Sequence, residues 1–117
     1  MAVIFHQAVV RVRAGERTDR GGNTVPDWSP GAVQRLTIGR LSVQPSIQSE
    51  RAQAERTEVA TGWRVLSAPG TDPDVRSSDR IEFDGLTCEV IGEVARWTHP
   101  VTGRTHHVEW QMTRATG

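Results

Sequence analysis

Four histidines are the first residues of this sequence that could do chemistry, because imidazole nitrogens bind zinc and carry protons. His99, His106, His107 and Glu109 lie close together near the C-terminus, and zinc accepts all of these ligand types. Adjacent residues of a strand point to opposite faces, so His106 and His107 are not expected to share one ion. His107 and Glu109 alone make a two-ligand site. The pattern therefore favours exposed or interface histidines, and we expect no metal and no cofactor.

Nucleophilic catalysis has less support in the sequence. The single cysteine, Cys88, falls on the inward face of an expected hairpin, with no basic neighbour there to lower its pKa. No serine occupies a Gly-x-Ser-x-Gly turn, and no glycine-rich loop has the spacing that cradles phosphate. Asp72 and Asp74 lie in a Pro/Gly-rich stretch, where aspartates form turns. We therefore expect a protein that is not an enzyme.

Tryptophan and arginine raise the question of nucleic-acid binding. Trp63 and Trp110 fall at inward strand positions and are expected in the core, whereas Trp28 and Trp97 could lie at an interface. Arg11 and Arg13 share a strand face that we expect to point outward. All 14 basic residues are arginine, and they balance 14 acidic residues. Zero net charge argues against a free-standing nucleic-acid binder, which usually carries a basic surplus.

The elements that position these residues are expected to be strands. With 117 residues, the chain has the size of one domain, residues 1–117. Its Val, Ile and Thr content suits pleated, half-buried surfaces. Alternation and turn signals predict an all-β fold, a small single-domain β-barrel of about five or six short strands. The expected strands cover residues 6–14, 33–43, 57–67, 80–83, 86–89, 93–98 and 106–114.

Two of these regions carry sharper local predictions. Asp84-Gly85 stands between two short alternating runs and predicts a type I′ hairpin, which pairs Phe83 with Leu86 and Ile81 with Cys88. In the run 33–43 the apolar phase switches at Gly39-Arg40, which a β-bulge would correct.

No apolar run approaches the roughly 18 residues of a membrane span, and the N-terminus has no signal-peptide pattern, so no membrane partner is expected.

Two long loops are expected, over about residues 15–31 and 45–57. Turn-forming residues dominate the first loop, and Trp28 is expected to anchor it while Asp19 and Asp27 bond backbone donors in its turns. Pro45 is expected to end the preceding strand. The second loop is polar and of mixed charge, and its length is typical of functional or disordered loops.

The order of several segments resembles head-to-tail stopper proteins of tailed bacteriophages. The resemblance begins in a strand followed by Arg17-Thr18-Asp19-Arg20-Gly21-Gly22-Asn23 and the Asp27-Trp28 pair. It continues through the segments Leu41–Pro45, Trp63–Val65, Asp79–Val90, Trp97–Pro100 and His106–Glu109, and so covers nearly the whole chain. Cys88 departs from the pattern, which more often has an aromatic residue at that position.

This resemblance implies a small SH3-like barrel that forms a ring under the portal and its adaptor. The ring would close the channel over packaged double-stranded DNA and provide a docking surface for the tail, in the virion and, during assembly, in the host cytoplasm. Arg17, Asp19, Arg20, Asp27 and Trp28 would bind partners or anchor the first loop. The loop over 45–57 would project into the channel as a gate, with its polar residues Gln48, Glu50, Arg51, Gln53, Glu55 and Arg56.

Three other functions stay open from the sequence. A tail-completion or tail-terminator protein would also form a ring of small β domains, although such proteins typically add helices. A single-strand-binding barrel would need exposed aromatic residues beside an arginine track. A metal-binding or toxin-like enzyme would need a metal. Because no large apolar stripe is left over once the strands are assigned, we expect a monomer that forms a ring only on its partners.

Overall fold

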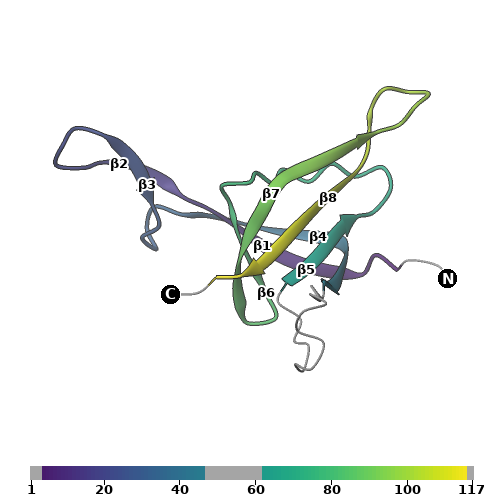
Figure 1. Ribbon diagram of the computed structural model, residues 1–117, viewed down its shortest axis with the longest axis horizontal. Coiled ribbons are helices and arrows are strands. Elements are labelled where there is room, and N and C mark those ends of the chain that lie inside the picture. Colours follow the sequence, from purple (N-terminus) through teal and green to yellow (C-terminus); the bar gives the residue numbers. More distant parts are fainter. Residues whose placement is uncertain (1–3, 47–61, 116–117) are drawn as a thin grey trace, which may run out of the picture.

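The computed structural model describes residues 4–46 and 62–115, and within these ranges all regular structure is β-strand. Figure 1 shows the strands around one barrel, with two hairpins that extend away from it. The strands are β1 (Gln7–Arg13), β2 (Gly15–Thr18), β3 (Thr24–Asp27), β4 (Gln34–Ser46), β5 (Gly62–Ser67), β6 (Arg80–Phe83), β7 (Leu86–Thr98) and β8 (Thr105–Arg114). Over the same residues, no helix has the length and apolarity needed to cross a membrane.

Six strands form a closed antiparallel barrel in the order β1-β4-β5-β8-β7-β6, and the barrel closes where β1 pairs with β6. Closure removes the open edges that would otherwise pair with other chains, which suits a small domain. The all-β barrel expected from the sequence is therefore confirmed. β2 and β3 form a separate two-stranded sheet outside the barrel.

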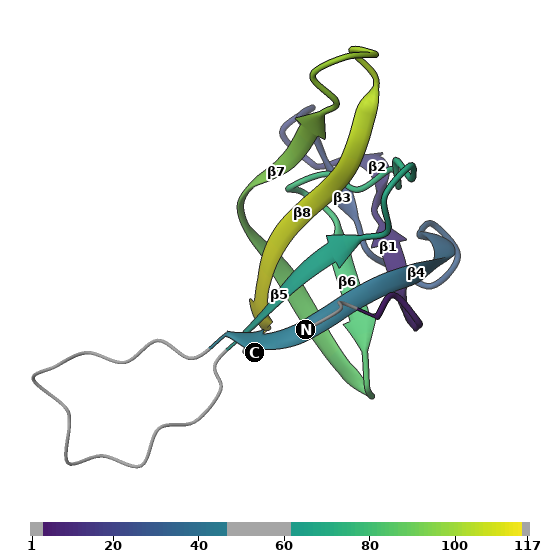
Figure 2. The same cartoon turned by 90° about the vertical axis from the view of Figure 1, so that its right-hand side faces the viewer.

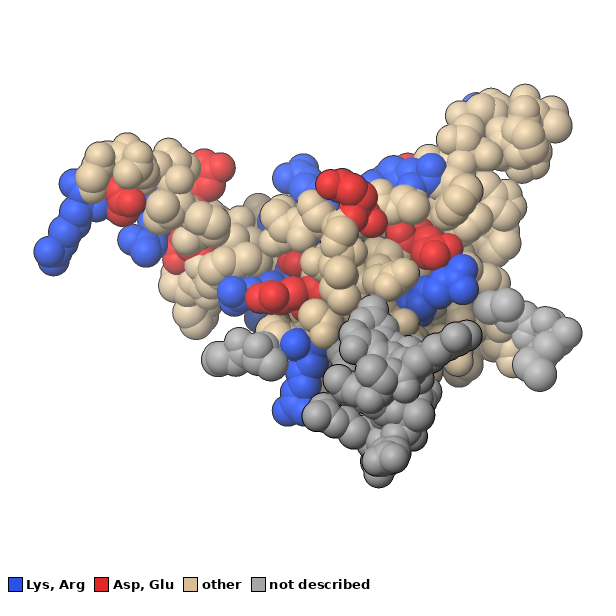
Figure 3. All heavy atoms as spheres, in the orientation of Figure 1, with Lys and Arg blue, Asp and Glu red and all other residues tan. Residues whose placement is uncertain are grey.

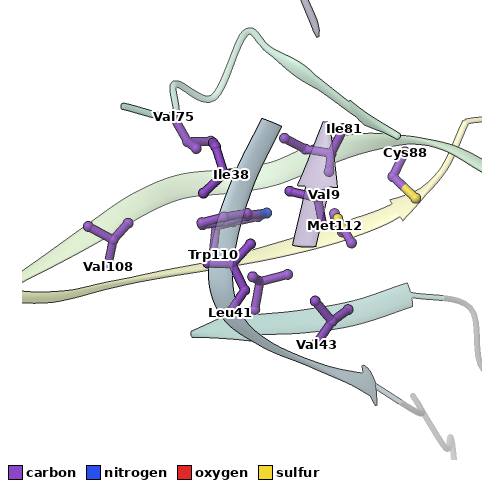
Figure 4. Packing of buried hydrophobic residues seen from close by; sticks show 11 residues of the cluster. Val9, Ile38, Leu41, Val43, Val75, Ile81, Cys88, Val108, Trp110 and Met112 are labelled. Carbon is purple, nitrogen blue, oxygen red and sulfur yellow. The ribbon is translucent and has the colours of Figure 1, made fainter. Parts of the chain in front are cut away.

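Side chains from every barrel strand fill the interior (Figure 4). Trp110 is the largest fully buried side chain, and Leu41, Ile81 and Met112 pack around it. Trp63 is partly buried and meets Phe83 edge to face, with 6.1 Å between ring centroids. The buried apolar cluster consists of Val9, Ile38, Leu41, Val43, Val65, Val75, Ile81, Cys88, Val108, Trp110 and Met112.

The expected bulge in β4 is present. β1 residues Gln7 and Val9 face Leu41 and Ile38, so β4 contains one residue more than β1 over this stretch. Arg40 takes a positive φ of 55°, and Ile38 and Leu41 can then both point inward. The pairing of β4 continues through Pro45 to Ser46, which faces Gly62. The strand therefore extends to Ser46, beyond the predicted range of 33–43 and past the expected stop at Pro45.

The β6–β7 hairpin also has the predicted register. Phe83 faces Leu86, Ile81 faces Cys88, and both turn residues, Asp84 and Gly85, have positive φ values of 52° and 75°. These angles define a type I′ turn, whose twist matches that of the flanking strands.

Two expectations about strands are corrected by the structure. The expected strand over 93–98 is the distal half of β7, which continues through a bulge at Gly92, where φ is 67°. The expected first loop, over 15–31, contains the β2–β3 hairpin. Apolar and polar residues alternate little in this hairpin, so no periodicity in the sequence indicated β2 and β3.

The orientation of β1 is a third correction. Arg11 was expected to point outward with Arg13, but Arg11 is buried with 6% of its surface exposed, and Val9 on the same face lies in the core. Val12, on the opposite face, is also buried. Both faces of β1 therefore contribute buried side chains, and the segment between β5 and β6 supplies the polar groups that bind Arg11 and Arg13.

Candidate interaction surfaces on two hairpins and a pinned loop

The β2–β3 hairpin is organised by the two aspartates singled out in the sequence. Asp19 Oδ1 accepts hydrogen bonds from the backbone N–H groups of Gly21 and Asn23, each at 2.9 Å. Asp27 Oδ1 accepts from the Ser29 hydroxyl at 2.7 Å and from the Ser29 N–H at 3.0 Å. The bond from the Ser29 hydroxyl, together with that from its N–H group, lowers the pKa of Asp27. Both carboxylates thus stabilise turns of the hairpin.

Trp28 connects this hairpin to the barrel. Its ring is half-buried, and the Arg80 guanidinium carbon lies 4.0 Å from a ring centroid, a cation–π contact with β6. A hollow of about 350 Å³ lies beside this contact, between the base of the hairpin and the residues that precede β6. Arg17 and Arg20 are exposed, and Figure 3 shows basic side chains at the far end of the hairpin. Trp28 therefore fixes the base of an arm whose end is charged and accessible.

A second feature is the loop over residues 68–79, which arginines hold against the barrel. Arg13 donates from Nε and Nη2 to the two carboxylate oxygens of Asp79, each at 2.9 Å. The Asp79 side chain is fully buried, and it also accepts from the Arg76 N–H at 2.8 Å. Arg13 also reaches Asp74, with Nη1 3.0 Å from Oδ2. These bonds raise the pKa of Arg13, and the bond from Arg13 lowers the pKa of Asp74.

Two further arginines bind the same loop. Arg11 donates to the Asp74 carbonyl at 3.1 Å, and Arg96 donates to the Val75 carbonyl at 3.1 Å. Arg96 also lies 3.3 Å from a carboxylate oxygen of Asp72. Arg11 and Arg13 were expected on a solvated face and Asp72 and Asp74 in a solvated turn, so the sequence analysis missed this network. The only signal was a cluster of aspartates in a chain rich in arginine.

The distal end of the β7–β8 hairpin gathers three of the four histidines. His99 Nδ1 accepts from the N–H groups of Val101 and Thr102 and so closes the turn. His106 and His107 were expected to point apart, but their Nδ1 atoms lie 2.8 Å apart in a hydrogen bond. The His107 ring stacks on Trp97, with 6.1 Å between centroids and 15° between planes. Across the described residues, no group of three or more ligating side chains is placed to hold a metal ion.

Cys88 lies in the barrel core, as its inward position in the sequence predicted. Burial raises the pKa of its thiol, so the thiol stays protonated at neutral pH. A buried, protonated thiol is an apolar filler of the core.

The expected gate residues lie outside the described residues. Gln48, Glu50, Arg51, Gln53, Glu55 and Arg56 fall between Ser46 and Gly62, which face each other at the end of the β4–β5 ladder. The structure therefore fixes where this segment leaves and rejoins the barrel, and its residues stay as a sequence-based expectation.

Comparison with known proteins identifies relatives in fold. No protein-family model matches the chain, and no curated protein matches it. The solution structure of protein SF1141 from Shigella flexneri 2a has a TM-score of 0.56 at 14% identity, and covers 99% of this chain and 98% of that one. A chain in the virion of a native gene transfer agent particle has a TM-score of 0.52 at 17% identity, with 97% of both chains covered. One structure that shares this fold from end to end is therefore a component of a virion particle.

Proposed function

We propose that this chain is a structural virion protein, and specifically a head-to-tail stopper of a tailed phage or phage-like particle. The observation that carries the proposal is the end-to-end similarity in fold to a chain of a gene transfer agent virion, which covers 97% of each chain. The ordered set of segments that resembles stopper proteins, from Arg17 to Glu109, supports the finer assignment.

The architecture suits a ring component. The closed barrel leaves no barrel edge open to uncontrolled pairing, so contacts must be made by projecting parts and outward faces. Two hairpins provide such parts: β2–β3 carries exposed Arg17 and Arg20, and the β7–β8 end carries Trp97 with 53% of its surface exposed. Figures 1 and 2 show the β7–β8 end standing beyond the barrel in both views. A subunit that contacts several neighbours needs distinct surfaces of this kind.

In this proposal the partners are the portal and adaptor above the ring, tail or tail-terminator proteins below it, and further copies of the same chain within it. The segment that joins β4 to β5 is the gate over packaged double-stranded DNA. Its mixed charge lets Arg51 or Arg56 of one copy pair with Glu50 or Glu55 of the next. Whichever of Arg51 and Arg56 is not paired in this way would contact DNA phosphates, weakly enough for the DNA to leave at ejection.

Disruption of the gene in a strain that produces the particles tests this function. We expect heads that package DNA, then lose it, and carry no tails under the electron microscope. Purified protein added to such an extract should restore tail joining, and mass spectrometry should find the protein in complete particles. Particles that form normally without the protein would refute a virion role. Full heads on abnormally long tails would instead indicate a tail terminator.

A further inference from the structure

The end of the β7–β8 hairpin presents apolar side chains in a fixed arrangement. Trp97 is 53% exposed and Val101 is 85% exposed. The Trp97 ring is held by stacking on His107, and His107 is bonded to His106. The turn itself is closed by His99, whose N–H donates to the Arg104 carbonyl at 2.8 Å. A large aromatic side chain that is exposed but already ordered loses little entropy on binding, which is typical of interface hot spots.

We call residues 97–107 the β7–β8 tip, and its ionisable side chains are all basic. The tip contains three histidines and Arg104 but no aspartate or glutamate. Among the described residues, the Arg104 guanidinium makes no ion pair. A partner surface that combines an apolar hollow with an accessible carboxylate would complement it.

The opposite end of β7 carries a hollow with these properties. A groove of about 490 Å³ lies between β1 and the β6–β7 turn, and its lining includes the half-buried residues Val10, Phe83 and Leu86, of which Phe83 and Leu86 also pack against the barrel core. Two carboxylates border it. Glu82 pairs with Arg35, whereas Asp84 is exposed in the turn and makes no ion pair with a described residue. We call this the β1–β6 groove.

We propose that the β7–β8 tip of one copy binds in the β1–β6 groove of a second copy of this chain. Trp97 and Val101 would cover Val10, Phe83 and Leu86, while Arg104 would approach Asp84. The tip follows the end of β7 and the groove borders its beginning, so the two surfaces are different and lie at opposite ends of one strand. A contact between unlike surfaces repeats head to tail and closes into a ring when the rotation permits. This inference rests on the proposed ring function for its biological role.

The contact can be tested in solution with full-length protein. Trp97→Ala retains the groove but loses the main side chain of the tip, so ¹⁵N-labelled Trp97→Ala protein reports on groove occupancy alone. Unlabelled wild-type protein, added to millimolar concentration, should shift the amide signals of Val10, Gly85 and Thr87. Unlabelled Trp97→Ala protein is the matched control and should leave them in place. Asp84→Arg in the labelled protein should reduce the shifts.

Shifts that are absent, equal for both titrants, or confined to other residues would overturn the inference. A second experiment separates it from the proposed function. Val101→Cys combined with Thr87→Cys should give a ladder of cross-linked copies in oxidised particles, and either cysteine alone should not. Complete particles without a ladder would refute the contact and leave the stopper role standing. Amide shifts for a protein that is absent from particles would leave the contact standing and refute the role.

Discussion

Arg13 and Asp79 show how single residues hold this small barrel together. The chain has no lysine, and the planar guanidinium of arginine bonds both oxygens of a carboxylate at once. Arg13 uses this geometry on Asp79, and Arg64 does the same on Glu109 across the β5–β8 ladder, with bonds of 3.0 and 3.1 Å. The Glu109 carboxylate raises the pKa of Arg64, as Asp79 does for Arg13. The Arg13–Asp79 pair orders a loop against the barrel, and the Arg64–Glu109 pair links two strands of the core.

Removal of the Asp79 carboxylate should destabilise the fold strongly. Asp79→Ala leaves the partly buried Arg13 guanidinium without its main partner and frees the Arg76 N–H, so we expect a loss of about 3–5 kcal/mol in unfolding free energy. Urea denaturation measures it. Asp72→Ala removes an exposed carboxylate from the same loop and should change stability by no more than about 0.5 kcal/mol. Similar losses in unfolding free energy for both variants would show that the buried Arg13–Asp79 pair contributes no more to stability than the exposed Asp72 contact.

Trp28→Ala should have a smaller effect than a core truncation. A fully buried tryptophan would lose about 3 kcal/mol or more on truncation, but the Trp28 ring is half-buried and its specific contact is with Arg80. We therefore expect about 1–2 kcal/mol in urea denaturation. Trp28→Phe retains an aromatic face and should lose less. If Trp28→Ala leaves the unfolding free energy unchanged but its particles cannot join tails, Trp28 is instead a partner contact.

Acid should weaken the attachment of the loop over 68–79. The Asp74 pKa is lowered in the folded state, so its contribution to stability is present above the ordinary aspartate pKa of about 3.9 and is lost as pH falls below it. Melting temperatures should therefore drop between pH 5 and pH 3. Asp74→Asn should flatten this dependence, whereas an unchanged acid profile in that variant would exclude Asp74 as a cause.

Among the elements, the sequence predicted best where the information was local. In the β6–β7 hairpin, the Asp84-Gly85 turn and the alternation of Ile81 and Phe83 specify the same register, and the structure has that register. The β2–β3 hairpin was missed because neither face of it is apolar enough to set a period of two. The burial of Arg11 depends on Asp74, 63 residues away in sequence, and no local pattern reveals such a partner.

The contact between β5 and β8 depends on a glycine. A Cβ atom at Gly62 would lie 2.5 Å from the Met112 carbonyl oxygen, a backbone atom that cannot move alone. Gly62→Ala should therefore cost about 1–3 kcal/mol by overpacking. Gly39→Ala places its methyl group where no atom lies within 4 Å, so it serves as the matched control and should be close to neutral in urea denaturation. Equal losses of stability for Gly62→Ala and Gly39→Ala would refute the close approach of Gly62 to Met112.

At the scale of the molecule, the barrel supplies rigid attachment points, and the projecting parts supply the contacts. Trp97, His107 and Arg104 form one surface, of which the sequence suggested a tryptophan at an interface and exposed or interface histidines. It did not reveal their arrangement, because the stacking and the turn depend on the pairing of β7 with β8. The segment between Ser46 and Gly62 differs from this surface, because its composition indicated a role from the sequence alone. The structure adds that Ser46 and Gly62, on either side of it, face each other in the β4–β5 ladder.

That segment yields the prediction that bears most on function. Deletion of Gln48–Glu55 leaves seven residues between Ser46 and Gly62, enough to connect two paired strand ends, so the barrel should melt at nearly the wild-type temperature. If the segment is the gate, particles with this variant should package DNA and then leak it, as measured by nuclease-sensitive DNA outside purified heads.

A Gly/Ser replacement of equal length keeps the span but removes the charges. Leakage with the deletion and retention with the replacement would mean that length alone closes the channel. Leakage with both would mean that the pairing of Arg51 or Arg56 with Glu50 or Glu55 is required, and full retention with both would show that the channel closes elsewhere.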